Sequence, residues 1–222
     1  MNTKKNILYF GIGALLAVTA ITFVVRSLLV RFRVVRLAKK EWENWGSPLT
    51  INGKIVKTGG VENQKGYAEK VGEYWKIGTG LNHDGYDTDI AWSSAFISYI
   101  MKQGGAGDKF VYSANHSKYI TDSIANRKKG NYKAPFVGYK IDEVEPQVGD
   151  LVCHSRQSGI TYDSTGNYLS HCDIVVAKKK NEIEVIGGNV SQTVMKKILK
   201  TDDKGKLVDK SQNFFTIIKT NI

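Results

Sequence analysis

The sequence predicts an α+β domain in which N-terminal helices pack on an antiparallel sheet, preceded by one transmembrane helix. Three observations support this prediction. An uncharged apolar run covers residues 7–25, apolar residues recur at helical spacing between residues 67 and 128, and short segments rich in Val and Ile follow Pro135. Helices first and strands second along the chain are typical of α+β domains. The 222 residues, 24% of them charged, fit one folded domain with an appendage.

The N-terminal segment has the features of a membrane anchor. Residues 7–25 hold no charge, and as a helix this run is about 28 Å long, enough to cross the hydrocarbon core of a bilayer. The run continues past Val18-Thr19-Ala20, which resembles a signal-peptidase site, so we expect an uncleaved anchor. Residues 27–37 mix apolar residues with three arginines, a pattern typical of a helix in the headgroup region. We therefore predict an anchor with a basic juxtamembrane helix (residues 1–40) and a globular domain (residues 41–222).

The net charge of +11 is unevenly distributed. The first 40 residues carry eight basic and no acidic residues, which leaves only +3 for the other 182. A basic segment beside an apolar span favours contact with anionic lipid headgroups. We therefore expect a membrane partner through residues 7–25 and no nucleic-acid partner.

The central prediction is a buried helix over residues 87–100. Apolar residues at positions 92, 95, 96, 99 and 100 recur at spacings of three and four, Asp87, Thr88 or Asp89 can cap its start, and Gly104-Gly105 ends it. Ser93 therefore falls in the first turn, beside free backbone N–H groups and the positive end of the helix dipole. Developing negative charge on a nucleophile is stabilised there.

The other elements follow from the same rules. Helices are expected over residues 67–77 and 113–128, the second carrying His116. Five strands are expected over residues 150–154, 172–177, 183–186, 192–198 and 214–219. Residues 156–169 form the loop between the first two strands, either a substrate-contacting flap or a long hairpin.

A candidate site combines the helix and the strands. His171 begins the second strand, and Asn189 follows Gly187-Gly188 at the end of the third. Each is commonly structural when taken alone. A nucleophile at a helix start, a histidine on the neighbouring strand and a polar orienting residue one strand further on form a nucleophile–base–orienter set.

Four motifs carry a family resemblance. They are Ala91-Trp92-Ser93-Ser94-Ala95-Phe96-Ile97-Ser98, Val148-Gly149-Asp150-Leu151-Val152, Ser170-His171-Cys172-Asp173-Ile174-Val175-Val176 and Gly187-Gly188-Asn189. Together they resemble the NlpC-like and CHAP peptidoglycan hydrolases, and more closely an uncharacterised bacterial branch in which Trp-Ser heads the helix and a Ser-Ala-x-His segment, here Ser113-Ala114-Asn115-His116, recurs. The similarity spans roughly residues 41–198.

The resemblance implies a papain-like fold and hydrolysis of amide bonds in cell-wall peptides. It places Ser93 as the nucleophile where the family has cysteine, His171 as the general base, Asn189 as the residue orienting the imidazole, and Trp92 and His116 at the substrate. A serine hydroxyl stays protonated and needs base assistance, unlike a thiolate. Ser93 therefore either runs a serine version of the triad or the site only binds. No cofactor and no metal are expected.

Cys153 and Cys172 leave alternatives open. They end and begin neighbouring strands, so a hairpin brings them together as a disulfide or as two buried thiols. Cys153 could also be a relocated nucleophile. A zinc site with His154 or His171 lacks a metal-ligand spacing such as C-x-x-C.

Three functions remain at this stage: a membrane-anchored peptidoglycan amidase or endopeptidase, an inactive peptidoglycan- or peptide-binding module, and a secreted antibacterial toxin with an immunity or other partner protein. Six basic residues follow the apolar span and two precede it, so the positive-inside rule favours a cytoplasmic domain. A cell-wall substrate requires instead a periplasmic or extracellular domain, which is the localisation we expect.

Overall fold

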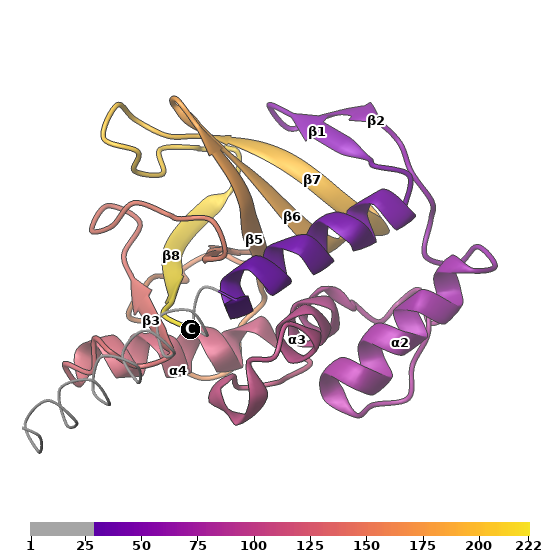
Figure 1. Ribbon diagram of the computed structural model, residues 1–222, viewed down its shortest axis with the longest axis horizontal. Helices are drawn as coiled ribbons and strands as arrows, with labels where there is room; N and C mark the ends of the chain where they lie inside the picture. Colours follow the sequence, from indigo (N-terminus) through magenta and orange to yellow (C-terminus); the bar gives the residue numbers. More distant parts are fainter. Residues whose placement is uncertain (1–28) are drawn as a thin grey trace, which may run out of the picture.

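A computed structural model describes residues 29–222 (Figure 1). The expected transmembrane segment, residues 7–25, lies outside the described residues. Within residues 29–222, no helix combines the length and the apolar character that crossing a membrane requires. The structure confirms the α+β class, with helices and an eight-stranded sheet.

A helix over residues 29–44 runs across the predicted boundary between residues 40 and 41 and packs against the globular domain. Val30, Val34 and Ala38 lie on one side of this helix and are buried in the main core. Arg31 donates hydrogen bonds to the carbonyl oxygen of Val148 and to a carboxylate oxygen of Asp150. The part of the proposed headgroup helix that is described, residues 29–37, therefore packs on protein.

The helices agree with the predicted order and differ at their ends. They are α2 (Tyr67–Thr79), α3 (Ser93–Gln103), a short 3-10 turn η1 (Gly107–Lys109) and α4 (His116–Lys128). Helix α3 begins at Ser93 with Trp92 at the N-cap and no side-chain cap, so the carboxylates at positions 87 and 89 do not cap it. Asn115 occupies the N-cap of α4.

The sheet is mixed rather than purely antiparallel. Its order is β2-β1-β7-β6-β5-β4-β8-β3, and β1 runs parallel to β7 while every other pair is antiparallel. The five expected strands are present as β4 (Leu151–Ser155), β5 (Ser170–Lys179), β6 (Glu182–Val190), β7 (Thr193–Lys200) and β8 (Asn213–Thr220). The strands that were not predicted are β1 (Leu49–Ile51), β2 (Lys54–Lys57) and β3 (Phe136–Tyr139), all at the sheet's ends.

Two apolar clusters lie on the two faces of the sheet. Alternate residues of β5 divide between them: Ile174 packs with the helices, and Val175 packs with Val185 and Ile217 on the other face. Helices α2, α3 and α4 gather on one side of the sheet (Figure 1). Gly188 of β6 allows α3 to approach closely, because a Cβ atom there would lie 2.5 Å from Cβ of Phe96.

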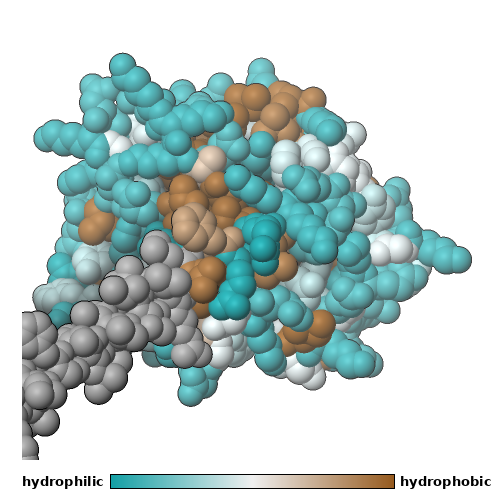
Figure 2. All heavy atoms as spheres, in the orientation of Figure 1, coloured by the Kyte–Doolittle hydropathy of each residue, from teal (hydrophilic) through white to brown (hydrophobic). Residues whose placement is uncertain are grey.

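The surface is mostly hydrophilic in the view of Figure 2, with hydrophobic residues in small separate areas. The loop over residues 156–169 is held against the domain: the Tyr162 hydroxyl donates to the carbonyl oxygen of Gly138 at 2.7 Å, and Asp163 pairs with Lys128 of α4 at 2.8 Å. The loop between β4 and β5 is therefore anchored to α4 and β3 in this structure.

Candidate functional site

Ser93 is the first residue of α3 and lies where the helix begins against the sheet. The first amides of an α-helix have no partner within the helix, and the helix dipole makes this end positive. Within residues 29–222, the backbone N–H groups of Ser93 and Ser94 donate to no other protein group. These amides are therefore free to bind an oxygen that carries negative charge.

His116 is the hydrogen-bond partner of Ser93. It is the first residue of α4, so the beginnings of two helices meet here. The distance from Ser93 Oγ to His116 Nε2 is 2.7 Å. Burial, followed by the charges of His171 and Arg156, holds the pKa of His116 well below its usual value. The imidazole is therefore neutral at neutral pH and has a lone pair available as a base.

A chain of hydrogen bonds continues behind His116. Its Nδ1 atom is hydrogen-bonded to the hydroxyl of Tyr119, one turn later on α4. Beside this pair, the Ser94 hydroxyl donates to the carbonyl oxygen of Ser113 at 2.8 Å.

Both ring nitrogens of His116 are hydrogen-bonded to hydroxyl groups, so the tautomer of the ring decides the direction of each bond. With the proton on Nδ1, where it is donated to the Tyr119 oxygen, the Nε2 lone pair accepts the hydroxyl proton of Ser93. This is the tautomer that a general base for Ser93 needs.

His171, predicted as the general base, is occupied elsewhere. Its Nε2 lies 3.0 Å from Oδ1 of Asp173, and its Nδ1 accepts a hydrogen bond from the Arg156 guanidinium at 3.0 Å. Its ring centre is 5.2 Å from that of His116. His171 and Asp173 are fully buried, whereas Ser93 and His116 keep 3% and 5% of their surface exposed. Of the two histidines, His116 is therefore slightly the more exposed, and it is the one bonded to Ser93.

The other predicted site residues have different surroundings from those expected. Asn189 has a positive φ of 53° and makes no hydrogen bond to His171, which Asp173 and Arg156 orient instead. Trp92 is 1% exposed, and its indole N–H donates to buried Glu62. Trp92 therefore belongs to the core rather than to an open substrate surface.

The first glycine of the Gly187-Gly188-Asn189 motif has a structural reason. A Cβ atom at this position of β6 would lie 2.1 Å from Oδ1 of Asp173 and 2.8 Å from Nε2 of His171. The His171–Asp173 pair therefore requires a residue without a side chain beside it. The residues that sequence reasoning missed, Tyr119 and Asp173, share a signal: His116 and Tyr119 are three apart on a helix, and His171 and Asp173 two apart on a strand, so each pair shares a face.

Cys153 and Cys172 form a disulfide between directly opposed positions of β4 and β5. Of the alternatives open at the sequence level, this one excludes Cys153 as a thiolate nucleophile while the bond is intact. The disulfide joins the strands that carry His154 and His171.

His154, His171 and Asp173 could in principle hold a metal ion, because their ligand atoms lie within 4.8 Å of one another. Two cations already occupy their surroundings. The ammonium group of Lys197 lies 2.7 Å from Oδ2 of Asp173, and Arg156 donates to His171. The single carboxylate is thus neutralised by protein groups, which disfavours a divalent cation at this cluster.

Comparison with protein families matches residues 79–217 to the family described as "Uncharacterized protein conserved in bacteria (DUF2272)". The match covers more than half of the chain, so the chain belongs to this family. It includes Ser93, His116 and the strands β4 to β7. Comparisons with curated proteins and with solved structures gave no match.

Proposed function

We propose that this member of the DUF2272 family hydrolyses amide bonds in peptidoglycan peptides, with Ser93 as nucleophile and His116 as general base, in a papain-like fold of the NlpC/CHAP type. The observation that carries the proposal is the 2.7 Å hydrogen bond between Ser93 Oγ and Nε2 of His116. A hydroxyl at a helix start beside a neutral imidazole is the arrangement that serine acylation needs.

The proposed reaction follows from these positions. The Ser93 oxygen attacks the peptide carbonyl while its proton passes to Nε2 of His116, and the free amides at the start of α3 stabilise the oxyanion. The lowered pKa of His116 makes its protonated form a strong acid, which then gives the proton to the leaving amine. Water, deprotonated by His116, hydrolyses the acyl-serine and restores both groups.

The proposed location is the outer side of a membrane, with residues 7–25 as the anchor. A disulfide between Cys153 and Cys172 supports this location, because such bonds persist in oxidising compartments. A cell-wall substrate would be present there.

A second candidate function is peptide binding without hydrolysis. Ser93 is only 3% exposed, and the residue behind His116 is a tyrosine rather than a carboxylate. Both features fit a site that binds a peptide without hydrolysing it.

The test is digestion of purified peptidoglycan by the full-length chain in detergent, with the released fragments separated by chromatography. We expect Ser93→Ala and His116→Ala each to lower the rate by about 100-fold or more. Ser123→Ala is the matched control, because this buried serine of α4 donates only to the carbonyl oxygen of Ile120. Full activity in Ser93→Ala would refute the mechanism, and muropeptide binding without any product would favour the second function.

A further inference from the structure

A groove of about 560 Å³ opens where the 156–169 loop leaves β4. Residues 154–158 form one wall and residues 210–213 the other. The wall residues include two cations, Arg156 and Lys210, and no carboxylate. The groove is therefore electropositive and favours an anionic ligand.

Arg156 lacks a carboxylate partner. One of its N–H groups donates to the neutral imidazole of His171. The nearby carboxylate of Asp173 pairs with Lys197 at 2.7 Å, and Arg156 forms no ion pair within residues 29–222. A guanidinium group presents five N–H donors in a planar fork, so most of this fork remains available to a ligand carboxylate.

His154 supplies a hydrogen-bond acceptor beside the donors of Arg156. It is 3% exposed and lines the same groove. Its Nδ1 atom lies 3.2 Å from the carbonyl oxygen of Ser155, which only accepts, so Nδ1 carries the proton. The Nε2 lone pair is buried and has no hydrogen-bond partner among residues 29–222. A buried acceptor without a donor is costly, and a ligand N–H group would satisfy it.

We propose that this groove binds a free carboxylate of the peptide substrate, with Arg156 as the residue that receives it and His154 accepting from a backbone N–H of the same peptide. A peptide terminus offers both a carboxylate and an amide N–H, whereas a phosphate group offers no N–H donor. This inference rests on the proposed function and names the substrate end that the site selects.

The groove is coupled to the Ser93–His116 pair by charge. Arg156 lowers the pKa of both His116 and His171, after the larger effect of burial. A bound carboxylate neutralises Arg156 and so makes His116 more basic. A substrate with a free carboxylate therefore both binds more tightly and strengthens the base that activates Ser93.

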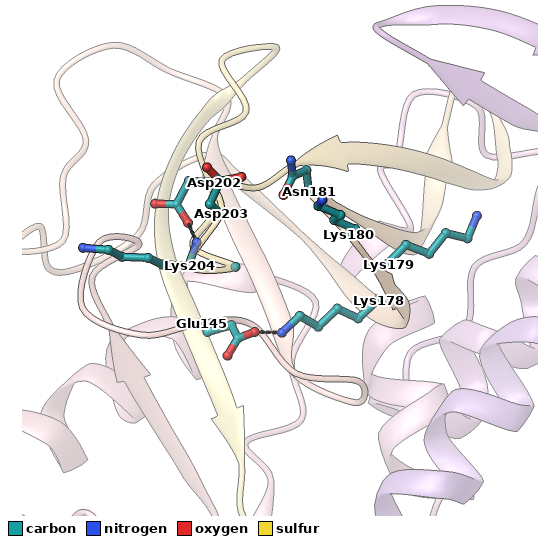
Figure 3. A pocket seen from close by; sticks show the side chains of 9 residues that line it. Glu145, Lys178, Lys179, Lys180, Asn181, Asp202, Asp203 and Lys204 are labelled. Atoms are coloured by element: carbon teal, nitrogen blue, oxygen red, sulfur yellow. Dashed lines mark hydrogen bonds and ion pairs between the residues drawn. The ribbon is translucent and has the colours of Figure 1, made fainter.

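The lysine-rich pocket of Figure 3 is a useful contrast. It is lined by four lysines together with Glu145, Asp202 and Asp203, and Lys178 pairs there with Glu145. Its charges largely cancel. Lys180, which lines this pocket, therefore serves as a control cation outside the groove.

The experiment measures binding of a peptidoglycan stem peptide and of the same peptide with an amidated C-terminus, by titration calorimetry, to the full-length chain carrying Ser93→Ala. We expect the free acid to bind about tenfold more tightly than the amide. Arg156→Gln should abolish this preference, Arg156→Lys should retain part of it, and Lys180→Ala should leave it intact.

The outcomes separate this inference from the proposed function. Equal binding of acid and amide, or a preference that survives Arg156→Gln in a variant with unchanged circular dichroism, overturns the carboxylate site. A preference that depends on Arg156 in a chain that digests no peptidoglycan supports the site and refutes only the hydrolase.

Discussion

The imidazole of His116 joins Ser93 to Tyr119: its Nε2 is hydrogen-bonded to the Ser93 hydroxyl at 2.7 Å, and its Nδ1 is hydrogen-bonded to the Tyr119 hydroxyl. The two helices that carry these residues start at the same place, so the pair forms from the first residue of each. Tyr119 is fully buried, and burial raises its pKa. It therefore stays neutral and acts through His116 rather than on the substrate.

Tyr119→Phe keeps the ring and removes the oxygen that accepts Nδ1–H of His116 in the proposed mechanism. We expect His116 to shift toward the Nε2–H tautomer, which can no longer accept the Ser93 proton, and peptidoglycan digestion to fall by about tenfold or more. Long-range ¹H–¹⁵N correlation spectra of the histidine side chains report the tautomer without an activity assay. Nε2–H for His116 in the wild type would contradict the tautomer that the mechanism needs, and Nδ1–H in both proteins would show that Tyr119 does not set it.

Stability should fall as the pH drops below about 6.5. His116, His154 and His171 all have lowered pKa values, mainly because of burial, and the pKa of His154 falls to about 3. Below pH 6.5 the histidines of the unfolded chain bind protons, whereas those of the folded chain do not. The free energy of unfolding therefore decreases with each pH unit, and for His154 this decrease continues to about pH 3.

The measurement is urea unfolding between pH 7.5 and pH 4.5. His154 alone should contribute about 1.4 kcal/mol of lost unfolding free energy per pH unit across this acidic range. His154→Gln should make the pH dependence shallower by up to one proton, with the other two histidines unchanged. A free energy of unfolding that is constant from pH 7.5 to pH 4.5 would show that these histidines are not buried in the neutral form.

The central strands were predictable because short runs rich in Val and Ile, separated by Gly, Asn and Asp, are a strong local signal. β3 was missed because Phe136–Tyr139 is four residues long, and β1 and β2 because they are short and largely exposed. The helix that carries Ser93 was also predictable from helical spacing, although it begins at Ser93 rather than near residues 87–89 as predicted.

The partner of Ser93 was not predictable in the same way. His116 and His171 both stand near the start of a regular element, and sequence spacing does not say which ring comes within 2.7 Å of a distant hydroxyl. That choice depends on Arg156 and Asp173, which hold both nitrogens of His171. The difference lies in the meeting of the starts of α3 and α4, a tertiary contact with no local pattern.

Gly187→Ala tests whether the His171–Asp173 pair needs an open space on β6. The added Cβ atom would lie 2.1 Å from Oδ1 of Asp173, so the pair must move. We expect a loss of about 2 kcal/mol in the free energy of unfolding, measured by urea denaturation. Gly72→Ala on α2 is the control: its nearest contact is 3.5 Å, and alanine favours a helix, so stability should stay level or rise. Equal stabilities for the wild type and Gly187→Ala would count against the close contact.

The helix over residues 29–44 should be required for the stability of the domain that follows it. Arg31 donates to the carboxylate of Asp150 at 2.8 Å, and the backbone N–H of Thr220 reaches the same carboxylate at 3.0 Å. Asp150 is fully buried, so removal of a cationic partner leaves its charge less well compensated. A fragment of residues 41–222 should therefore unfold at a lower temperature than one of residues 29–222, because it also loses the buried side chains of Val34 and Ala38.

Arg31→Met separates the ion pair from the apolar packing of this helix. We expect it to lower the free energy of unfolding by about 2 kcal/mol in the 29–222 fragment, measured by urea denaturation. Arg36→Met is the matched control, since Arg36 lies on the same helix and is exposed. The opposite result would be that both variants unfold like the parent fragment and that residues 41–222 alone are equally stable. The helix would then not stabilise the domain, and the predicted boundary after residue 40 would hold.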